Sequence, residues 1–181
     1  MKTSEEQDLL NQARAFDSSA LAAIYDRFSP GLYAYAMRLL GDQCLAEDCV
    51  AETFSRFLKA LQSGQGPDAH LQAYLYRVAH NWITDHYRRQ PLPTLSLDSD
   101  LHEEPDSNPS FLLSIEQERQ RIRSALLRLP EDQRQVVELR FLEDWSHREV
   151  AIALGKSEEA TRALQHRALI TLRRLLAEEV R

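Results

Sequence analysis

Apolar residues recur three and four positions apart along most of this chain, which is the spacing that one buried face of a helix requires. One such set is Leu71, Tyr74, Leu75, Val78, Ala79, Trp82 and Ile83. No stretch alternates apolar and polar residues in the way that a half-buried strand does. Only 5 glycines and 7 prolines interrupt the 181 residues, so long helices are possible. The sequence therefore predicts an all-α protein.

The helical spacing fails in one long stretch, PLPTLSLDSDLHEEPDSNPSFLL, at residues 91–113. Proline, serine and five acidic residues dominate this stretch, which contains no lysine or arginine. Such a composition does not bury enough apolar surface to form a core and is typical of a flexible linker. We therefore expect two small helical domains, at 1–90 and 114–181, joined by a flexible acidic linker at 91–113.

The linker carries most of the chain's net charge of −6. Residues 1–90 contain 9 basic and 11 acidic side chains, and residues 114–181 contain 13 basic and 12 acidic ones. The C-terminal domain is thus close to neutral, and the overall isoelectric point of about 5.5 says little about its surface.

No apolar run reaches the roughly 20 residues that span a bilayer, and the charged N-terminus lacks the apolar core of a signal peptide. These features predict a cytoplasmic protein with no membrane contact of its own. Cys44 and Cys49 form no CxxC pair, so we expect two reduced thiols and no metal. His80 and His86 share a helix with Asp85 but, six positions apart, not a face. We expect no cofactor, no catalytic site and no enzymatic activity.

Helix-start and helix-stop residues divide the N-terminal domain further. Ser18 and Ser19 can cap a first amphipathic helix, which the sequence SPG at 29–31 is expected to interrupt. Gly41 is expected to end the resumed helix, and Asp42 to begin the next one. The remaining helices are predicted at 42–61, 70–89, 111–129 and 131–141.

The stretch WSHREVAIALGKSEEATRALQHRALITLRR, residues 145–174, predicts a helix-turn-helix. Gly155 tolerates the positive φ of a sharp turn, and Ser157 can cap the second helix. Lys156 and Thr161 stand where apolar residues usually pack such a turn. We expect the Thr161 hydroxyl to bond a carbonyl one turn back.

The outward residues near the start of the second helix are candidates for contacts to duplex DNA. Arginine can bond guanine through two hydrogen bonds, and glutamine can bond adenine in the same way. The candidates are Lys156, Ser157, Glu158, Arg162, Gln165, His166 and Arg167. A helical hairpin with charged faces and no nucleic acid partner is the alternative.

The helix predicted at 70–89 has a polar face as well as its apolar one. Arg77, Asn81, Thr84 and Arg88 fall within about a third of a turn, and aromatic residues that include Trp82 lie between them. Aromatic rings with a basic rim can hold unpaired bases. A polar face that merely contacts solvent is the alternative.

These blocks together resemble the sigma factors of bacterial RNA polymerase. The segment LPEDQRQVVELRFLEDWSHREVAIALGKSEEATRALQHRALITLRRLL is similar to sigma region 4. The segments ALAAIYDRFSPGLYAYAMRLLGD, AEDCVAETFSRFLKAL and AYLYRVAHNWITDHYRR are similar to region 2. Because the chain lacks the bulk for regions 1 and 3, it resembles the short, extracytoplasmic-function (ECF) branch of the sigma-70 family.

The resemblance implies core RNA polymerase and promoter DNA as partners, with docking on the clamp coiled coil of the largest subunit and on the flap. The implied polymerase contacts are Glu47, Asp48, Glu52 and Phe54. The face with Arg77, Asn81, Trp82, Thr84 and Arg88 would bind the −10 element, and residues 156–167 would bind the −35 element. Many members of this family are held inactive by an anti-sigma factor, but nothing in this sequence identifies one.

Two further questions stay open at the level of sequence. The acidic linker fits a simple tether, and equally a charge mimic of nucleic acid in the polymerase's RNA exit path. A stand-alone helix-turn-helix regulator, with an N-terminal effector or dimerisation domain, is the alternative to a sigma factor. Such a regulator would bind its DNA tightly without polymerase.

Overall fold

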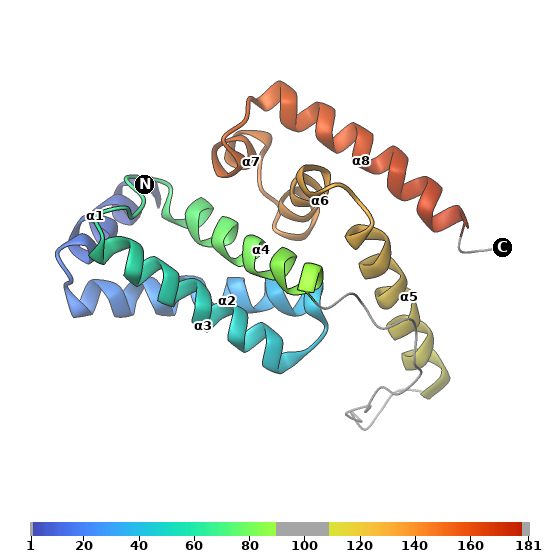
Figure 1. Ribbon diagram of the computed structural model, residues 1–181, viewed down its shortest axis with the longest axis horizontal. Coiled ribbons are helices and arrows are strands. Elements are labelled where there is room, and N and C mark those ends of the chain that lie inside the picture. Colours follow the sequence, from blue (N-terminus) through green and yellow to red (C-terminus); the bar gives the residue numbers. More distant parts are fainter. Residues whose placement is uncertain (1, 90–108, 179–181) are drawn as a thin grey trace.

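The structure, a computed structural model, describes residues 2–89 and 109–178 (Figure 1). Within these ranges every regular element is helical, which confirms the prediction of an all-α fold. The helices are α1 (Lys2–Arg14), α2 (Ser18–Leu40), α3 (Gln43–Gln62), α4 (Leu71–Arg89), α5 (Pro109–Leu127), α6 (Glu131–Val137), a π-helical turn η1 (Glu138–Leu142), α7 (His147–Leu154) and α8 (Glu158–Glu178). We call residues 2–89 the N-terminal half and residues 109–178 the C-terminal half.

The N-terminal half is a bundle in which α2 packs on both α3 and α4 (Figure 1). Its centre holds Leu32, Tyr35, Phe57 and Leu75, all at most 1% exposed. The tilted ring pair of Phe57 and Tyr74 joins α3 to α4, with centroids 6.0 Å apart. Burial of this apolar face supplies most of the stability of such helices, since isolated helices of their length are marginal in water.

Helix α2 runs without a break through Pro30, so the interruption predicted at 29–31 is wrong. A proline inside a helix loses one backbone hydrogen bond and crowds the preceding turn, at a cost of about 3 kcal/mol. Phe28 and Leu32 on either side are nevertheless buried in the core, and this packing offsets the cost. Tertiary burial therefore overrides the local signal.

The ends of α2 and α3 carry the caps that fix their lengths. Asp17, rather than Ser18 or Ser19, caps α2, and its carboxylate accepts a hydrogen bond from the Ala20 N–H at 2.8 Å. Gly41 ends α2 with φ of 70°, and Asp42 caps α3 by accepting from the Leu45 N–H, as predicted.

In the C-terminal half, α5 begins at Pro109, so the last five residues of the predicted linker are helical. Residues 91–108 of that linker lie outside the described residues. A small apolar cluster of Leu126, Leu129, Val137 and Ala168 joins α5, α6 and α8. The domain boundaries at 90 and 113 remain predictions.

The helix predicted at 131–141 exists, but its last turn is the π-helical η1. A π turn inserts one extra residue into the helical register and rotates the side chains that follow it. Leu139 is buried, whereas Phe141 is 52% exposed. The chain then turns through Asp144, at φ of 54°, and buries Trp145.

The two halves pack against each other instead of standing apart. Helix α4 contacts α7 and lies close to α6, with the C-terminal half on one side of the α1–α4 bundle (Figure 1). One continuous core cluster contains residues of both halves, and its members from the C-terminal half are Val136, Leu139, Trp145, Val150, Ala153 and Leu164. No helix among the described residues is long and apolar enough to cross a membrane.

Candidate nucleic-acid interface

Helices α7 and α8 form the predicted helix-turn-helix. Ser146 begins α7 with a reciprocal capping box, in which its hydroxyl accepts from the Glu149 N–H and the Glu149 carboxylate accepts from the Ser146 N–H. Hydrogen bonds from the Ser146 side chain and backbone to the carboxylate lower the pKa of Glu149. Gly155 adopts φ of 63°, and the next N–H, of Lys156, donates to the Ala151 carbonyl at 2.9 Å. The turn is therefore closed by backbone bonds that need a left-handed residue.

Thr161 and Lys156, which stand where apolar residues usually pack such a turn, both find polar partners. Thr161 is fully buried, and its hydroxyl donates to the Glu158 carbonyl at 2.7 Å, as predicted. Ser157 caps α8 by accepting from the Ala160 N–H at 3.1 Å, also as predicted. Lys156 pairs with Asp132 of α6 at 3.0 Å, which links the turn to the neighbouring helix.

The predicted DNA-contacting residues of α8 differ in their accessibility. Arg162, His166 and Arg167 are exposed on the outward face. Glu158 pairs with Arg162 at 3.1 Å along the helix, and Gln165 is half-buried. Two arginines and one histidine are thus exposed on the first three turns of α8, where a recognition helix contacts base edges.

The predicted face of α4 is only partly open to solvent. Arg77 and Asn81 are exposed, and the half-buried Trp82 ring stacks on His86 with centroids 5.5 Å apart. Thr84 accepts a hydrogen bond from Arg134 of α6 at 3.0 Å, and Arg88 lies 3.9 Å from Glu131. The C-terminal half therefore already contacts two of the five residues.

The predicted polymerase-docking residues of α3 also separate into two sets. Glu47 and Asp48 are exposed, and the half-buried Glu52 accepts from Arg56, which lowers the pKa of the Glu52 carboxyl. Phe54 is only 8% exposed and lies against the exposed ring of Tyr25, with centroids 4.8 Å apart. Phe54 is therefore largely buried, whereas Glu47 and Asp48 are open to a partner.

A groove of about 260 Å³ opens beside these carboxylates, between α2 and α3. Its lining residues are Tyr25, Ser29, Pro30, Tyr33, Glu47, Val50 and Ala51. Nearby, Cys44 is an exposed thiol, whereas burial raises the pKa of the Cys49 thiol to about 12. No group of three metal-ligating side chains occurs among residues 2–89 and 109–178.

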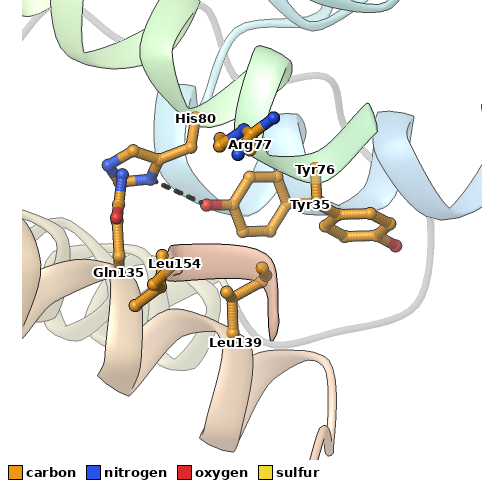
Figure 2. Close-up of a pocket in the computed structure, with 8 residues that line it drawn as sticks. Tyr35, Tyr76, Arg77, His80, Gln135, Leu139 and Leu154 are labelled. Atoms are coloured by element: carbon orange, nitrogen blue, oxygen red, sulfur yellow. Dashed lines mark hydrogen bonds between the residues drawn. The ribbon is translucent and has the colours of Figure 1, made fainter. Parts of the chain in front are cut away.

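No motif in the sequence predicted the buried polar cluster that lies between the halves, of which Figure 2 shows Tyr35 and His80. The Tyr35 hydroxyl donates to Glu138 at 2.9 Å and lies 3.0 Å from Nδ1 of His80, which is itself 3.1 Å from Glu138. Arg134 lies 3.8 Å from the other Glu138 oxygen. Burial, and then the Glu138 charge, raise the pKa of Tyr35 well above its ordinary value. The available signal was Glu138 itself, a carboxylate within the apolar run VVELRFL.

Family models match most of the two halves. The model for sigma-70 region 2 matches residues 24–91, and that for sigma-70 region 4 matches residues 119–172. The first segment contains α3 and α4, and the second contains the helix-turn-helix.

Known proteins match across nearly the whole chain. The ECF RNA polymerase sigma factor BldN of Streptomyces coelicolor is 32% identical over 178 residues, covering 96% of this chain and 67% of BldN. The ECF RNA polymerase sigma factor SigL of Mycobacterium tuberculosis is 29% identical over 92% of this chain and 94% of SigL. The solved structure of CnrH in complex with the cytosolic domain of CnrY matches with a TM-score of 0.67 and 25% identity, over 96% of this chain and 97% of that chain.

The helix-turn-helix has an exposed recognition face, and the other half contains a second polar helix. Both features agree with the similarity to BldN and SigL, which extends over more than 90% of this chain. The chain belongs to the extracytoplasmic-function branch of the sigma-70 family of RNA polymerase sigma factors.

Proposed function

We propose that this sigma factor docks on core RNA polymerase through the acidic face of α3, binds the −10 element with α4 and binds the −35 element with α8. Sigma factors are initiation factors that bind core polymerase and promoter DNA, and this chain is therefore not an enzyme. The proposal assigns those two partners to particular residues. Its place of action would be the cytoplasm, where core polymerase and DNA are found.

One observation carries the proposal: a tight turn joins α7 and α8 as in a helix-turn-helix, while the outward face of α8 is exposed. The turn is fixed by Gly155 at φ of 63° and by the buried Thr161. Arg162, His166 and Arg167 remain exposed beside it. A rigid support with outward donors is what direct recognition of base edges in the major groove requires.

On the polymerase side, charge and exposure support Glu47 and Asp48 as direct contacts. Both are exposed, and Glu47 lines a groove together with Tyr25, whose ring packs against Phe54. Exposed carboxylates next to an apolar groove fit a partner surface that combines basic and apolar side chains.

Transcription in vitro tests the assignment. Core polymerase, this chain and a library of bacterial genomic fragments should yield transcripts whose mapped start sites share two upstream elements. Arg162→Ala should weaken transcription and relax base preference at one position of the upstream element, by about 1–3 kcal/mol for a bidentate base contact. Arg119→Ala is the matched control, because Arg119 is an exposed arginine on α5 whose ion-pair partner among the described residues is Glu116, on the same helix.

Docking is tested separately by Glu47→Lys combined with Asp48→Lys. This double variant should lose affinity for core polymerase, measured by fluorescence anisotropy of a labelled chain, while its far-UV circular dichroism is unchanged. Asp8→Lys, an exposed acid on α1, is the control. Equal loss in both would contradict a docking role for α3.

The alternative, a stand-alone regulator, makes the opposite prediction for DNA binding. The near-neutral C-terminal half neutralises few phosphates, so the free chain should bind duplex DNA weakly and without strong sequence preference. Tight, specific binding by the chain without core polymerase would favour the regulator.

An anti-sigma factor is a further partner within this proposal. CnrH, which matches this chain over 96% of its length, was solved with the cytosolic domain of another protein, CnrY. We infer that this chain also accepts a regulatory protein segment. Copurification from its host, followed by mass spectrometry of the bound protein, tests for one.

A further inference from the structure

We propose that helix α1 sets the base preference of this chain at the −10 element, by holding the loop between α3 and α4 and the first turn of α4 in place. We call residues 63–70 the α3–α4 loop. The proposal rests on the proposed binding of the −10 element by α4, and it adds positioning residues that this function did not include. The region 2 model begins its match at residue 24, so α1 lies outside the matched segment.

Helix α1 is anchored firmly enough to act as a support. It lies at the end of the bundle where α3 leads into α4, and it contacts α2, α3 and α4 (Figure 1). Leu10 and Ala13 are fully buried in the shared core. Gln7 and Arg14 are seven positions apart, so they lie on one side of the helix. This side faces the α3–α4 loop, because both residues donate hydrogen bonds to it.

The second part of the α3–α4 loop takes its hydrogen bonds from α1. The Arg14 guanidinium donates to the Pro67 carbonyl at 2.8 Å and also pairs with the Asp68 carboxylate. The Gln7 amide donates to the Asp68 carbonyl at 2.8 Å. Helix α1 therefore holds two successive peptide groups of the loop.

Helix α1 also supplies an acceptor to the first turn of α4. The Glu6 carboxylate accepts from the Gln72 N–H at 3.2 Å, at a helix start whose N–H groups lack helical partners. Between the two sets of bonds, His70 is exposed and adopts φ of 56°, a conformation that needs support from its surroundings in a residue other than glycine. The bonds from α1 reach residues on both sides of His70.

The α3–α4 loop ends on the polar side of α4. The His70 carbonyl accepts from the Tyr74 N–H at 3.0 Å, so position 70 begins the helical register. In that register, position 70 falls within about 20° of Arg77 and of Asn81, the two exposed polar residues assigned to the −10 element. A base bound beside α4 thus lies next to the end of this loop, and its fit depends on where the loop is held.

The bonds from α1 affect the position of the loop more than the stability of the fold. The Asp68 side chain is 94% exposed, and exposed ion pairs contribute little to stability. A binding surface held in one arrangement discriminates between ligands, whereas a mobile surface adapts to several. Loss of these bonds should therefore relax base preference while the chain stays folded.

Nuclear magnetic resonance relaxation of ¹⁵N in the free, full-length chain tests whether α1 holds the loop. In the parent chain the amides of residues 68–70 should have order parameters near the value of rigid backbone, about 0.85. Gln7→Ala combined with Arg14→Ala should lower them to below about 0.6, with a melting temperature close to the parental one. The matched control, Gln12→Ala combined with Arg27→Ala, removes the same two residue types from exposed positions and should leave the loop rigid.

Base selection during transcription tests the consequence for the promoter. The promoter most strongly transcribed from the genomic fragments is rebuilt with each position of its −10 and −35 elements varied in turn. The Gln7→Ala, Arg14→Ala chain should lose about threefold to tenfold of its preference for the best base at one or two −10 positions, the size of effect that lost hydrogen bonds produce. Its preferences at the −35 element should be parental, because α8 binds that element. A general loss of folded chain would instead lower transcription from every sequence alike.

Unchanged −10 preferences in this double variant, or an equal loss in the matched control, would overturn the role of α1. Loop amides that stay rigid in the double variant, or that are already mobile in the parent, would overturn it as well. If the parent chain drove no transcription with core polymerase, the proposed function itself would fail, whatever the order of the loop.

Discussion

At the scale of single residues, hydrogen bonds at helix ends determine where the recognition unit begins. The capping box of Ser146 and Glu149 satisfies two N–H groups that the first turn of α7 leaves without helical partners. Glu149 has a lowered pKa because the Ser146 side chain and backbone bond its charged form. The Glu149 carboxylate therefore contributes stability at pH values above its pKa in the unfolded chain. This contribution is lost as the pH falls through its lower pKa in the folded chain.

Ser146→Ala should lower the free energy of unfolding by about 1 kcal/mol near neutral pH, because one capping bond is lost. Glu149→Gln should keep much of the cap but reduce the loss of stability on acidification below about pH 4. Urea unfolding at pH 7 and at pH 3.5 measures both effects. Glu159→Gln, in the first turn of α8, serves as the control. An unchanged acid dependence in Glu149→Gln would exclude a role for its charge.

The buried carboxylate of Glu138 leads to a larger expected effect. Glu138→Ala would leave Arg134 and His80 buried without their acceptor, and removing one partner of a buried ion pair costs about 3–5 kcal/mol. Glu138→Gln should cost less, because an amide oxygen still accepts from Tyr35. Chemical denaturation measures both variants against Glu131→Ala, an exposed acid whose loss should change stability by under about 0.5 kcal/mol.

The sequence predicted residues whose partners are local and missed those whose partners are distant. Gly41, Asp42 and Ser157 act on their own helix ends, and all three were predicted correctly. Glu138 meets Tyr35, a residue 103 positions away. No spacing rule relates two such positions, so this cluster could only be found in the folded structure.

At the scale of elements, α2 shows how packing overrides a helix-breaking signal. Pro30 and Gly31 stand together in its middle, and local propensity alone predicted an end there. The two residues have different consequences in the fold. Pro30 is exposed, whereas a side chain added at Gly31 would lie 2.8 Å from the Tyr76 hydroxyl, which already donates to Glu143.

Pro30→Ala should therefore stabilise the protein by roughly 1–2 kcal/mol, because α2 regains a backbone N–H and loses the ring's crowding, less the entropy that proline removes from the unfolded chain. Gly31→Ala should destabilise it, although alanine is normally the better helix former by about 1 kcal/mol. The melting temperatures of the two variants should move in opposite directions. A rise in both would mean that Tyr76 moves aside at little cost.

At the scale of the whole molecule, the halves that the sequence separates are joined by a shared core. A linker of low hydropathy predicts two independent domains, and the family models likewise match two separate segments. The apolar faces of α4 and α7 could not be assigned to each other from sequence, since each fits a core within its own half. The structure places them in one cluster with Trp145 at the junction.

This shared core predicts that the two halves unfold together. In a Trp82→Phe background the remaining tryptophan, Trp145, reports on the junction, where it lies 7% exposed against Tyr76. Its fluorescence and the far-UV circular dichroism should then change at the same urea concentration, as in a two-state transition.

Arg38→Glu should separate the two signals, because the junction loses the ion pair between Arg38 and Glu143 while each half keeps its own helices. The Trp145 transition would move to lower urea concentration, whereas most of the helical signal would persist to higher concentration. Arg119→Glu makes an equal change of charge on α5, away from the Arg38–Glu143 pair. It should leave the fluorescence and circular dichroism curves superimposed. If Trp145 already became exposed first in the Trp82→Phe chain, the two halves would unfold as independent units.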